Sequence, residues 1–149
     1  MNGLLIKSHW IELILNGQKC WEIRGNNTKI RGKIALIKSG TSQIVGHCEI
    51  TDVIGPLTLE HMESTVQYHH SDLSKGLPYN KTYAWLLSNV VQFDKPIPYM
   101  HPQGAVIWVK LDEELSRVCT VLDQNGTNRW RRTCQRYQSI KQRWKLQEP

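Results

Sequence analysis

The chain carries an unusual charged segment, Gly17-Gln18-Lys19-Cys20-Trp21-Glu22-Ile23-Arg24, directly after an amphipathic stretch. If this segment is a strand, its side chains alternate between two faces. Lys19, Trp21 and Ile23 would then share one face, and Cys20, Glu22 and Arg24 the other. Alternation for burial alone would place the polar residues on one face only. Because charge falls on both faces here, we expect at least one charged side chain to face something other than bulk water or plain core, and we look for a functional site at this segment.

Hydrophobic periodicity and turn residues predict further elements on either side of this segment. A short buried strand is expected over 4–6, followed by a helix from an N-cap at Ser8 to Asn16. The later elements are expected to be strands over 33–38, 43–54, 82–93 and 105–110, a short helix over 59–63 capped by Thr58, and helices over 112–122 and from Asn128 to about 146. The residues 68–80 are expected to form a loop, with one helical turn as an open alternative. This order predicts an α+β fold in which a compact mixed sheet curls into a small barrel with flanking helices.

Composition and charge indicate the class of partner. A chain of 149 residues is one ordinary domain, and its net charge of +6 favours an anionic partner, with nucleic acid first and a membrane surface second. Seven basic residues and no acidic residue lie between Arg129 and Lys145. We therefore expect RNA or a nucleotide-like ligand as the partner, with DNA as an open alternative.

Other classes of function are not indicated. No two of the four cysteines lie closer than 15 residues, so zinc or redox spacing is missing, and we expect no metal site and no cofactor. No run approaches the roughly 18 apolar residues that a membrane span requires. No signal peptide opens the chain, which favours a cytoplasmic location.

The residues 3–110 resemble the ASCH family, a branch of the PUA-like fold. The resemblance is carried by the helix 10–16, the G-x-K-x-x-E-x-R pattern from Gly17 to Arg24, Arg31-Gly32 and Gly46. Later pieces also fit, namely Tyr83-Ala84-Trp85, Pro96-Ile97-Pro98 and Gly104-x-x-x-Trp108. The resemblance implies a PUA-like barrel over 1–110, with 111–149 as a helical C-terminal extension outside the match.

The resemblance also implies a cleft that binds RNA or a nucleotide-like ligand. Some ASCH proteins look like amidohydrolases acting on 4-acetylcytidine, and another type is proposed to cut RNA. In the amidohydrolase type a lysine after the helix corresponds to Lys19, but a threonine three residues later is replaced here by Glu22. A small hydrolase or ribonuclease using Lys19 and Glu22 is therefore the alternative to a binding domain.

The candidate ligand-binding residues in the first half of the chain are Lys19, Trp21, Glu22, Arg24 and Arg31. Lys19 would contact a phosphate or a carbonyl oxygen. Glu22 would accept hydrogen bonds from a base edge or act as general base. Trp21 would stack on a base. A purely structural ion pair is the other interpretation of Lys19 and Glu22. Nothing in the sequence indicates a lowered pKa for Lys19, so we expect binding rather than catalysis. Other aromatic candidates for a stacking platform are Trp10, Tyr68, Tyr79, Tyr83 and Trp85.

The C-terminal segment combines an aromatic face with basic residues. Trp130, Tyr137 and Trp144 fall on one face of the expected helix. Arg131, Arg132 and Arg136 are expected to track a phosphate backbone. A membrane-surface helix or a protein-interaction module remains open as the alternative.

Overall fold

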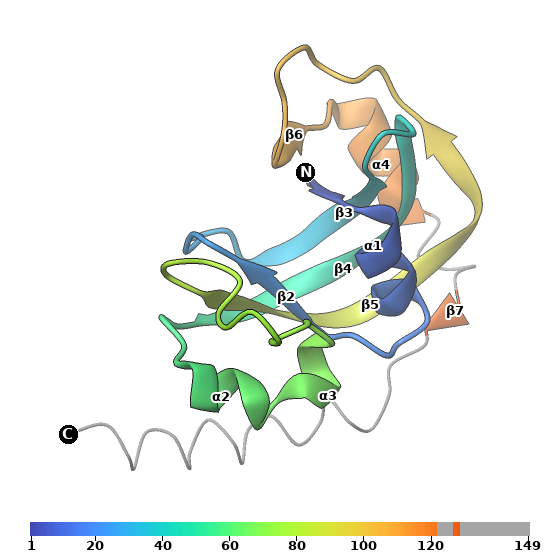
Figure 1. Cartoon of the computed structure of the whole chain (residues 1–149). Helices are drawn as coiled ribbons and strands as arrows, with labels where there is room; N and C mark the ends of the chain where they lie inside the picture. Colours follow the sequence, from blue (N-terminus) through green and yellow to red (C-terminus); the bar gives the residue numbers. More distant parts are fainter. Residues whose placement is uncertain (122–126, 129–149) are drawn as a thin grey trace.

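The computed structural model describes residues 1–121 and 127–128, which form one mixed β-sheet with helices around it (Figure 1). The strands run in the order β2-β5-β4-β3-β1-β6, and β7 pairs with β5. Their bounds are β1 Asn2–Ile6, β2 Trp21–Arg24, β3 Gly32–Lys38, β4 Gln43–Ile54, β5 Tyr83–Pro98, β6 Trp108–Lys110 and β7 Thr127–Asn128. The helices are α1 Ser8–Leu15, α2 Leu59–Glu63, α3 Val66–His69 and α4 Glu113–Val121.

The sheet is mixed because β1 pairs with β3 in parallel, while the other pairings are antiparallel. A parallel pair requires a long crossover connection, which α1 and β2 provide here. β2 lies at one edge of the sheet, and β1 lies next to the other edge. The sheet curls into a half-barrel, and the side chain of Arg24 in β2 donates a hydrogen bond to the carbonyl oxygen of Leu5 in β1 (2.8 Å). β1 and β2 do not pair with each other, and we call the gap between these two strands the seam.

The central strands are buried on both faces, which explains their nearly continuous apolar sequences. In β3, Ile34 and Leu36 belong to one core cluster, which includes the inward face of α1. The alternate residues, Ala35 and Ile37, belong to a second cluster on the opposite face, to which α4 contributes Cys119. A third cluster packs α2 and α3 against β2 and the start of β5. In Figure 1, α2 and α3 lie at one end of the sheet and α4 lies near the other.

The predicted α+β class and curled mixed sheet are confirmed, with differences at individual residues. Thr58 caps α2 as expected, because its Oγ1 accepts a hydrogen bond from the backbone N–H of His61 (3.1 Å). The expected cap at Ser8 is wrong, since Lys7 occupies the N-cap of α1 and makes no side-chain cap bond. Asn128 was expected to cap a basic helix but pairs with Val91 as part of β7.

β4 and β5 approach closely at Gly46, beside an irregularity in their register. A Cβ atom at this position would overlap the backbone carbonyl oxygen of Val91 and press on the side chain of Leu15 in α1. Backbone atoms of a central strand cannot move aside cheaply in a close-packed core. Glycine at position 46 therefore lets the two central strands and α1 pack together.

We predict that Gly46→Ala lowers the free energy of unfolding by roughly 2 kcal/mol or more, because the added methyl group overpacks the core. The matched control is Gly40→Ala, where φ is +81° and a Cβ would meet nothing within 4 Å. This control should cost about 1 kcal/mol, from backbone strain alone. Urea denaturation of both variants measures the difference, and a Gly46→Ala cost no larger than that of the control would contradict the steric argument.

Candidate nucleic-acid interface

A small polar cavity lies along the seam, with walls from both β1 and β2. This central cavity has a volume of about 180 Å³, and its walls include Trp10 of α1 together with Glu22 and Arg24 of β2. It lies beside a larger aromatic cavity of about 720 Å³, whose walls include Trp85 and Trp108. A loop cavity of about 250 Å³ lies between the turn after β3 and the loop after β5.

The three cavities adjoin one another, because they share wall residues. Arg24 and Tyr79 line both the central and the aromatic cavity. Leu5, Ser39 and Val106 line both the central and the loop cavity. We call the three cavities together the seam groove.

Three charged side chains meet around Glu22, which is a wall of the central cavity. Lys19 Nζ lies 3.8 Å from Glu22 Oε1, and Arg24 Nη2 lies 3.6 Å from Glu22 Oε2. Lys19 and Glu22 are only 2% and 3% exposed. Burying an isolated carboxylate costs several kcal/mol, so the two cations offset the burial of Glu22. The structure therefore brings together the three ionisable residues of the segment from which the sequence analysis started.

Arg24 holds the two sides of the seam together. Its Nη2 donates to the carbonyl oxygen of Leu5 and also forms the ion pair with Glu22. Its guanidinium carbon lies 5.6 Å from the ring centre of Trp85. A planar guanidinium suits such a position, because it can stack on an aromatic face and donate hydrogen bonds in its own plane. Nη1 and Nε of Arg24 donate no hydrogen bond to the described residues.

Lys19 is held behind Glu22 and is not a wall of the seam groove. Its Nζ donates to the carbonyl oxygen of His69 (2.8 Å) and lies 4.6 Å from the ring centre of Trp10. Burial lowers the pKa of Lys19 to about 8, although the charge of Glu22 raises it in part and Arg24 lowers it further. The sequence alone gives no indication of this lowered pKa, because desolvation depends on packing that the local sequence does not reveal.

Glu22 presents an oxygen that is buried but lacks a hydrogen-bond donor. Among the described residues, no group donates a hydrogen bond to Oε2, whose nearest charged neighbour is Arg24 Nη2. Buried carboxylate oxygens are usually hydrogen-bonded. Since Glu22 is a wall of the central cavity, a ligand N–H group entering it could supply the missing donor.

The segment α2–α3 positions Lys19 through three consecutive residues. The N–H of Cys20 donates to the carbonyl oxygen of Tyr68 (3.0 Å), and the ring of His70 bonds the carbonyl oxygen of Gln18 (2.8 Å). Between these two hydrogen bonds lies a third, from Lys19 Nζ to the carbonyl oxygen of His69. His69 was expected in a surface loop but is completely buried at the end of α3. Its Nδ1 accepts from the N–H of Ser71, so Nε2 carries the proton and donates to the carbonyl oxygen of Met62.

Trp21 lies away from the seam groove. Its side chain is 1% exposed and stacks on Tyr68 in the third core cluster, with ring centres 5.0 Å apart. The expectation that Lys19 and Trp21 share a strand face is wrong, because β2 begins only at Trp21 and Lys19 precedes it. Lys19 instead turns to the side of Glu22.

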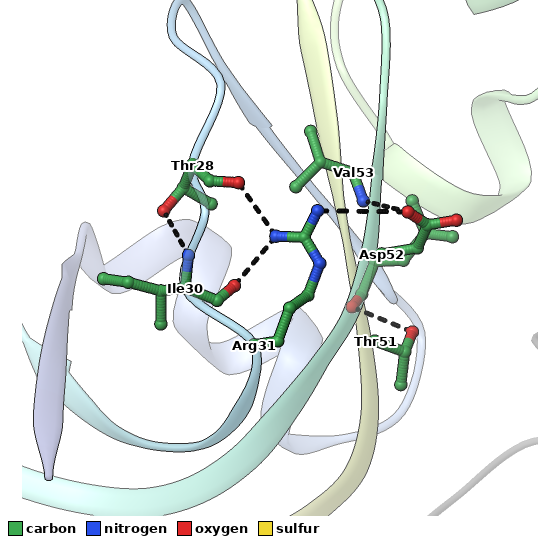
Figure 2. Close-up of polar contacts among 7 residues, drawn as sticks. Thr28, Ile30, Arg31, Thr51, Asp52 and Val53 are labelled. Atoms are coloured by element: carbon green, nitrogen blue, oxygen red, sulfur yellow. Dashed lines mark hydrogen bonds and ion pairs between the residues drawn. The ribbon is translucent and has the colours of Figure 1, made fainter.

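Arg31 stabilises the turn between β2 and β3, as Figure 2 shows. Its Nη1 donates to the carbonyl oxygens of Thr28 (2.8 Å) and Ile30 (2.9 Å), and its Nη2 lies 4.0 Å from Asp52 Oδ1 (Figure 2). Thr28 in turn accepts a hydrogen bond from the N–H of Ile30 (Figure 2). Arg31 is not a wall of the seam groove, and its observed contacts join the turn to β4.

The three arginines expected to bind phosphate in the C-terminal segment, Arg131, Arg132 and Arg136, lie outside the described residues. The same holds for the aromatic face of Trp130, Tyr137 and Trp144.

Sequence reasoning did not assign a site role to several walls of the groove. Trp10 and Tyr79 were only two of several aromatic candidates, Trp108 was noted only as part of the family resemblance, and Lys81 was not singled out. Tyr79 is 45% exposed in a loop rich in turn residues. An exposed aromatic residue followed closely by a lysine is a weak sequence signal for a nucleic-acid site.

The described residues include no group of three His, Cys, Asp or Glu side chains that could hold a metal ion. Among the same residues, the helices are all too short or too polar to cross a membrane.

Comparison with known proteins agrees with this geometry at the level of the fold. Two crystal structures of an ASCH protein from Zymomonas mobilis superimpose on the chain with TM-scores of 0.61 and 0.60, the second being a single-residue variant. Their identities to the chain are 12% and 13%, and each comparison covers 85% of this chain and 96% or 98% of the other. No protein with a curated description matches the chain in sequence.

The family model described as the ASCH domain matches residues 4–97, which begin within β1 and include β2 to β4 and nearly all of β5. This match spans more than half of the chain and contains the Lys19, Glu22 and Arg24 cluster. The chain therefore belongs to the ASCH domain family.

Proposed function

We propose that the protein binds RNA or a nucleotide-like ligand in the seam groove. The observation that carries this proposal is Glu22, a wall residue of the central cavity whose buried Oε2 receives no hydrogen bond from the described residues. A carboxylate accepts hydrogen bonds from the amino group of a base edge. Arg24 and Lys7 line the same cavity and supply positive charge for a phosphate.

The size of the central cavity agrees with a small planar group. Its volume of about 180 Å³ is below the roughly 300–1,000 Å³ of pockets for drug-sized ligands. Trp10 forms one wall and offers a flat aromatic face. A single base with its edge toward Glu22 fits these chemical features.

The C-terminal segment would add affinity without base recognition. Twelve basic and twelve acidic residues precede Arg129, so the net charge of +6 comes from residues 129–149, which contain seven basic residues and the single acidic residue Glu148. Phosphate contacts of this kind supply binding that depends on salt but carry no sequence information. We propose that the groove selects the ligand and the segment 129–149 attracts the phosphate backbone.

We predict that Glu22→Gln weakens binding of a fluorescein-labelled, mixed-sequence 12-nucleotide RNA by about 10-fold or more, because a charge-assisted hydrogen bond is lost. Fluorescence anisotropy measures the affinity, and the thermal midpoint checks the fold. The matched control is Glu12→Gln, which removes a partly exposed ion pair with Lys38 (3.0 Å) outside the groove walls and should leave binding unchanged. If Glu22→Gln lowers stability while affinity stays the same, Glu22 is only a structural ion-pair partner.

We also predict that the triple charge reversal Arg131→Glu, Arg132→Glu, Arg136→Glu weakens the same RNA complex and flattens its salt dependence. Losing three phosphate contacts from a single-stranded ligand should make the slope of log K against log salt shallower by about 2. Anisotropy titrations at several KCl concentrations give this slope. An unchanged slope would show that these arginines do not contact the ligand.

A hydrolase acting on a modified nucleoside or on RNA is the second candidate, and the lowered pKa of Lys19 favours it. A lysine with a pKa of about 8 has a small neutral fraction at pH 7, which a nucleophile or general base requires. Against this, Lys19 is not a wall of the groove and its Nζ donates to the carbonyl oxygen of His69. Incubation with 4-acetylcytidine and with labelled RNA, followed by chromatography, separates turnover from binding. Product that forms with the wild type but not with Lys19→Met would establish the hydrolase.

We predict that one lysine of a ¹³C-lysine-labelled sample titrates near pH 8, and that its signal is absent in Lys19→Met. Ordinary lysines titrate near pH 10.4. Glu22→Gln should lower this pKa further, because the carboxylate favours the charged amine, whereas Arg24→Gln should raise it by removing a like charge. Equal shifts in the same direction in both variants would contradict the assigned electrostatic causes.

A further inference from the structure

We infer that the seam groove holds two consecutive nucleotides of a single RNA strand, one base in the central cavity and the next in the aromatic cavity, with Tyr79 between them. This inference rests on the proposed function. It goes further by assigning a second base subsite and a residue that separates the two subsites. Arg24 would contact the phosphate that links the nucleotides.

The first step of the argument is the junction between the two cavities. Of the residues that the structure describes, only Arg24 and Tyr79 appear among the walls of both. They therefore lie where one cavity passes into the other. One of them is a cation and the other an aromatic ring, which are the two groups that single-stranded nucleic acid meets repeatedly on its binding proteins.

The second step is the position of the Tyr79 ring. A Cβ atom on Gly25 would lie 2.8 Å from Tyr79 Cδ1, so the ring packs directly on the backbone of the residue after Arg24. Tyr79 is nevertheless 45% exposed. A ring that is fixed by a backbone contact but still exposed can stack on a base with little further loss of conformational freedom.

The third step is the chemistry of the aromatic cavity. Trp85 and Trp108 stack in its wall with ring centres 5.7 Å apart and planes 11° apart. The exposed residues Asn80 and Lys81 are also among its walls. An apolar aromatic surface edged by an amide and a cation suits a base with its phosphate.

The fourth step is the set of donors left on Arg24. Its contacts to Leu5 and Glu22 both use Nη2. Its side chain is 19% exposed, and Nη1 and Nε make no hydrogen bond to the described residues. These donors at the junction can bind a phosphate that spans from one base subsite to the next.

The test compares the affinity of the protein for mononucleotides with its affinity for dinucleotides. The ligands are AMP, CMP, GMP and UMP, the corresponding nucleoside 5′-diphosphates, and the dinucleotides pApA, pCpC, pGpG and pUpU. Each competes with the labelled 12-nucleotide RNA in anisotropy. For the best-bound base, the dinucleotide should bind about 10-fold more tightly than the monophosphate, since this is the order of the gain from stacking one base. The diphosphate should show less of this gain, because it adds charge without a second base.

Two variants of Tyr79 complete the test. Tyr79→Ala should reduce the ratio of dinucleotide to mononucleotide affinity to about 3-fold or less, because one ring face is lost. Tyr79→Phe keeps the ring and should retain the wild-type ratio. Because the readout is a ratio within each variant, a general loss of stability does not imitate the effect.

The outcomes separate this inference from the function on which it rests. If the 12-nucleotide RNA binds but mononucleotides and dinucleotides bind equally, or if Tyr79→Ala leaves the ratio unchanged, the second subsite is overturned and the proposed function stands. A diphosphate that matches the dinucleotide would likewise overturn the second base subsite. If the 12-nucleotide RNA does not bind at all, both are overturned.

Discussion

The interaction on which the site depends is the hydrogen bond from Arg24 to the carbonyl oxygen of Leu5. The mixed sheet has β2 at one edge and β1 beside the other, and these strands do not pair. A closed barrel satisfies its edge groups by pairing, whereas here a carbonyl of β1 accepts its hydrogen bond from a side chain of the edge strand β2. Because one guanidinium group also balances Glu22 and covers Trp85, the charge, the seam and the aromatic wall have fixed relative positions.

The cluster of Lys19, Glu22 and Arg24 concentrates energetically costly groups at the wall of the central cavity and directly behind it. A buried ion pair contributes little net stability, because desolvation of the charges offsets their attraction. This cluster includes a lysine whose pKa is lowered by burial and a carboxylate oxygen that receives no hydrogen bond from the described part of the chain. Conflicts of this kind between local physics and the fold are expected at functional sites. The cluster thus differs from the exposed pair of Glu12 and Lys38, which has no such cost.

The sequence predicts the element order and the charged cluster but not the walls around it. Periodicity locates β3 because both faces of that strand are apolar, and Thr58 marks the start of α2 by a local hydrogen bond. The expected alternation of side chains between two faces fails at Lys19. The backbone N–H of Cys20 bonds to Tyr68 in α3, and β2 begins only at Trp21. Tyr79 joins the site through contacts between segments far apart in the chain, and local patterns contain no information on such contacts.

The distribution of the groove walls along the chain has a consequence for how the protein acquires and keeps its site. The central cavity combines Leu5, Glu22, Ser39, Tyr79 and Val106, which come from five separate regions of the sequence. No fragment that lacks one of these regions contains the complete cavity, and the cavity forms only when the long-range pairing of the sheet is finished. A ligand of the groove therefore recognises the native state alone. By mass action such a ligand opposes global unfolding, so occupancy of the site and resistance of the whole domain to denaturation rise together.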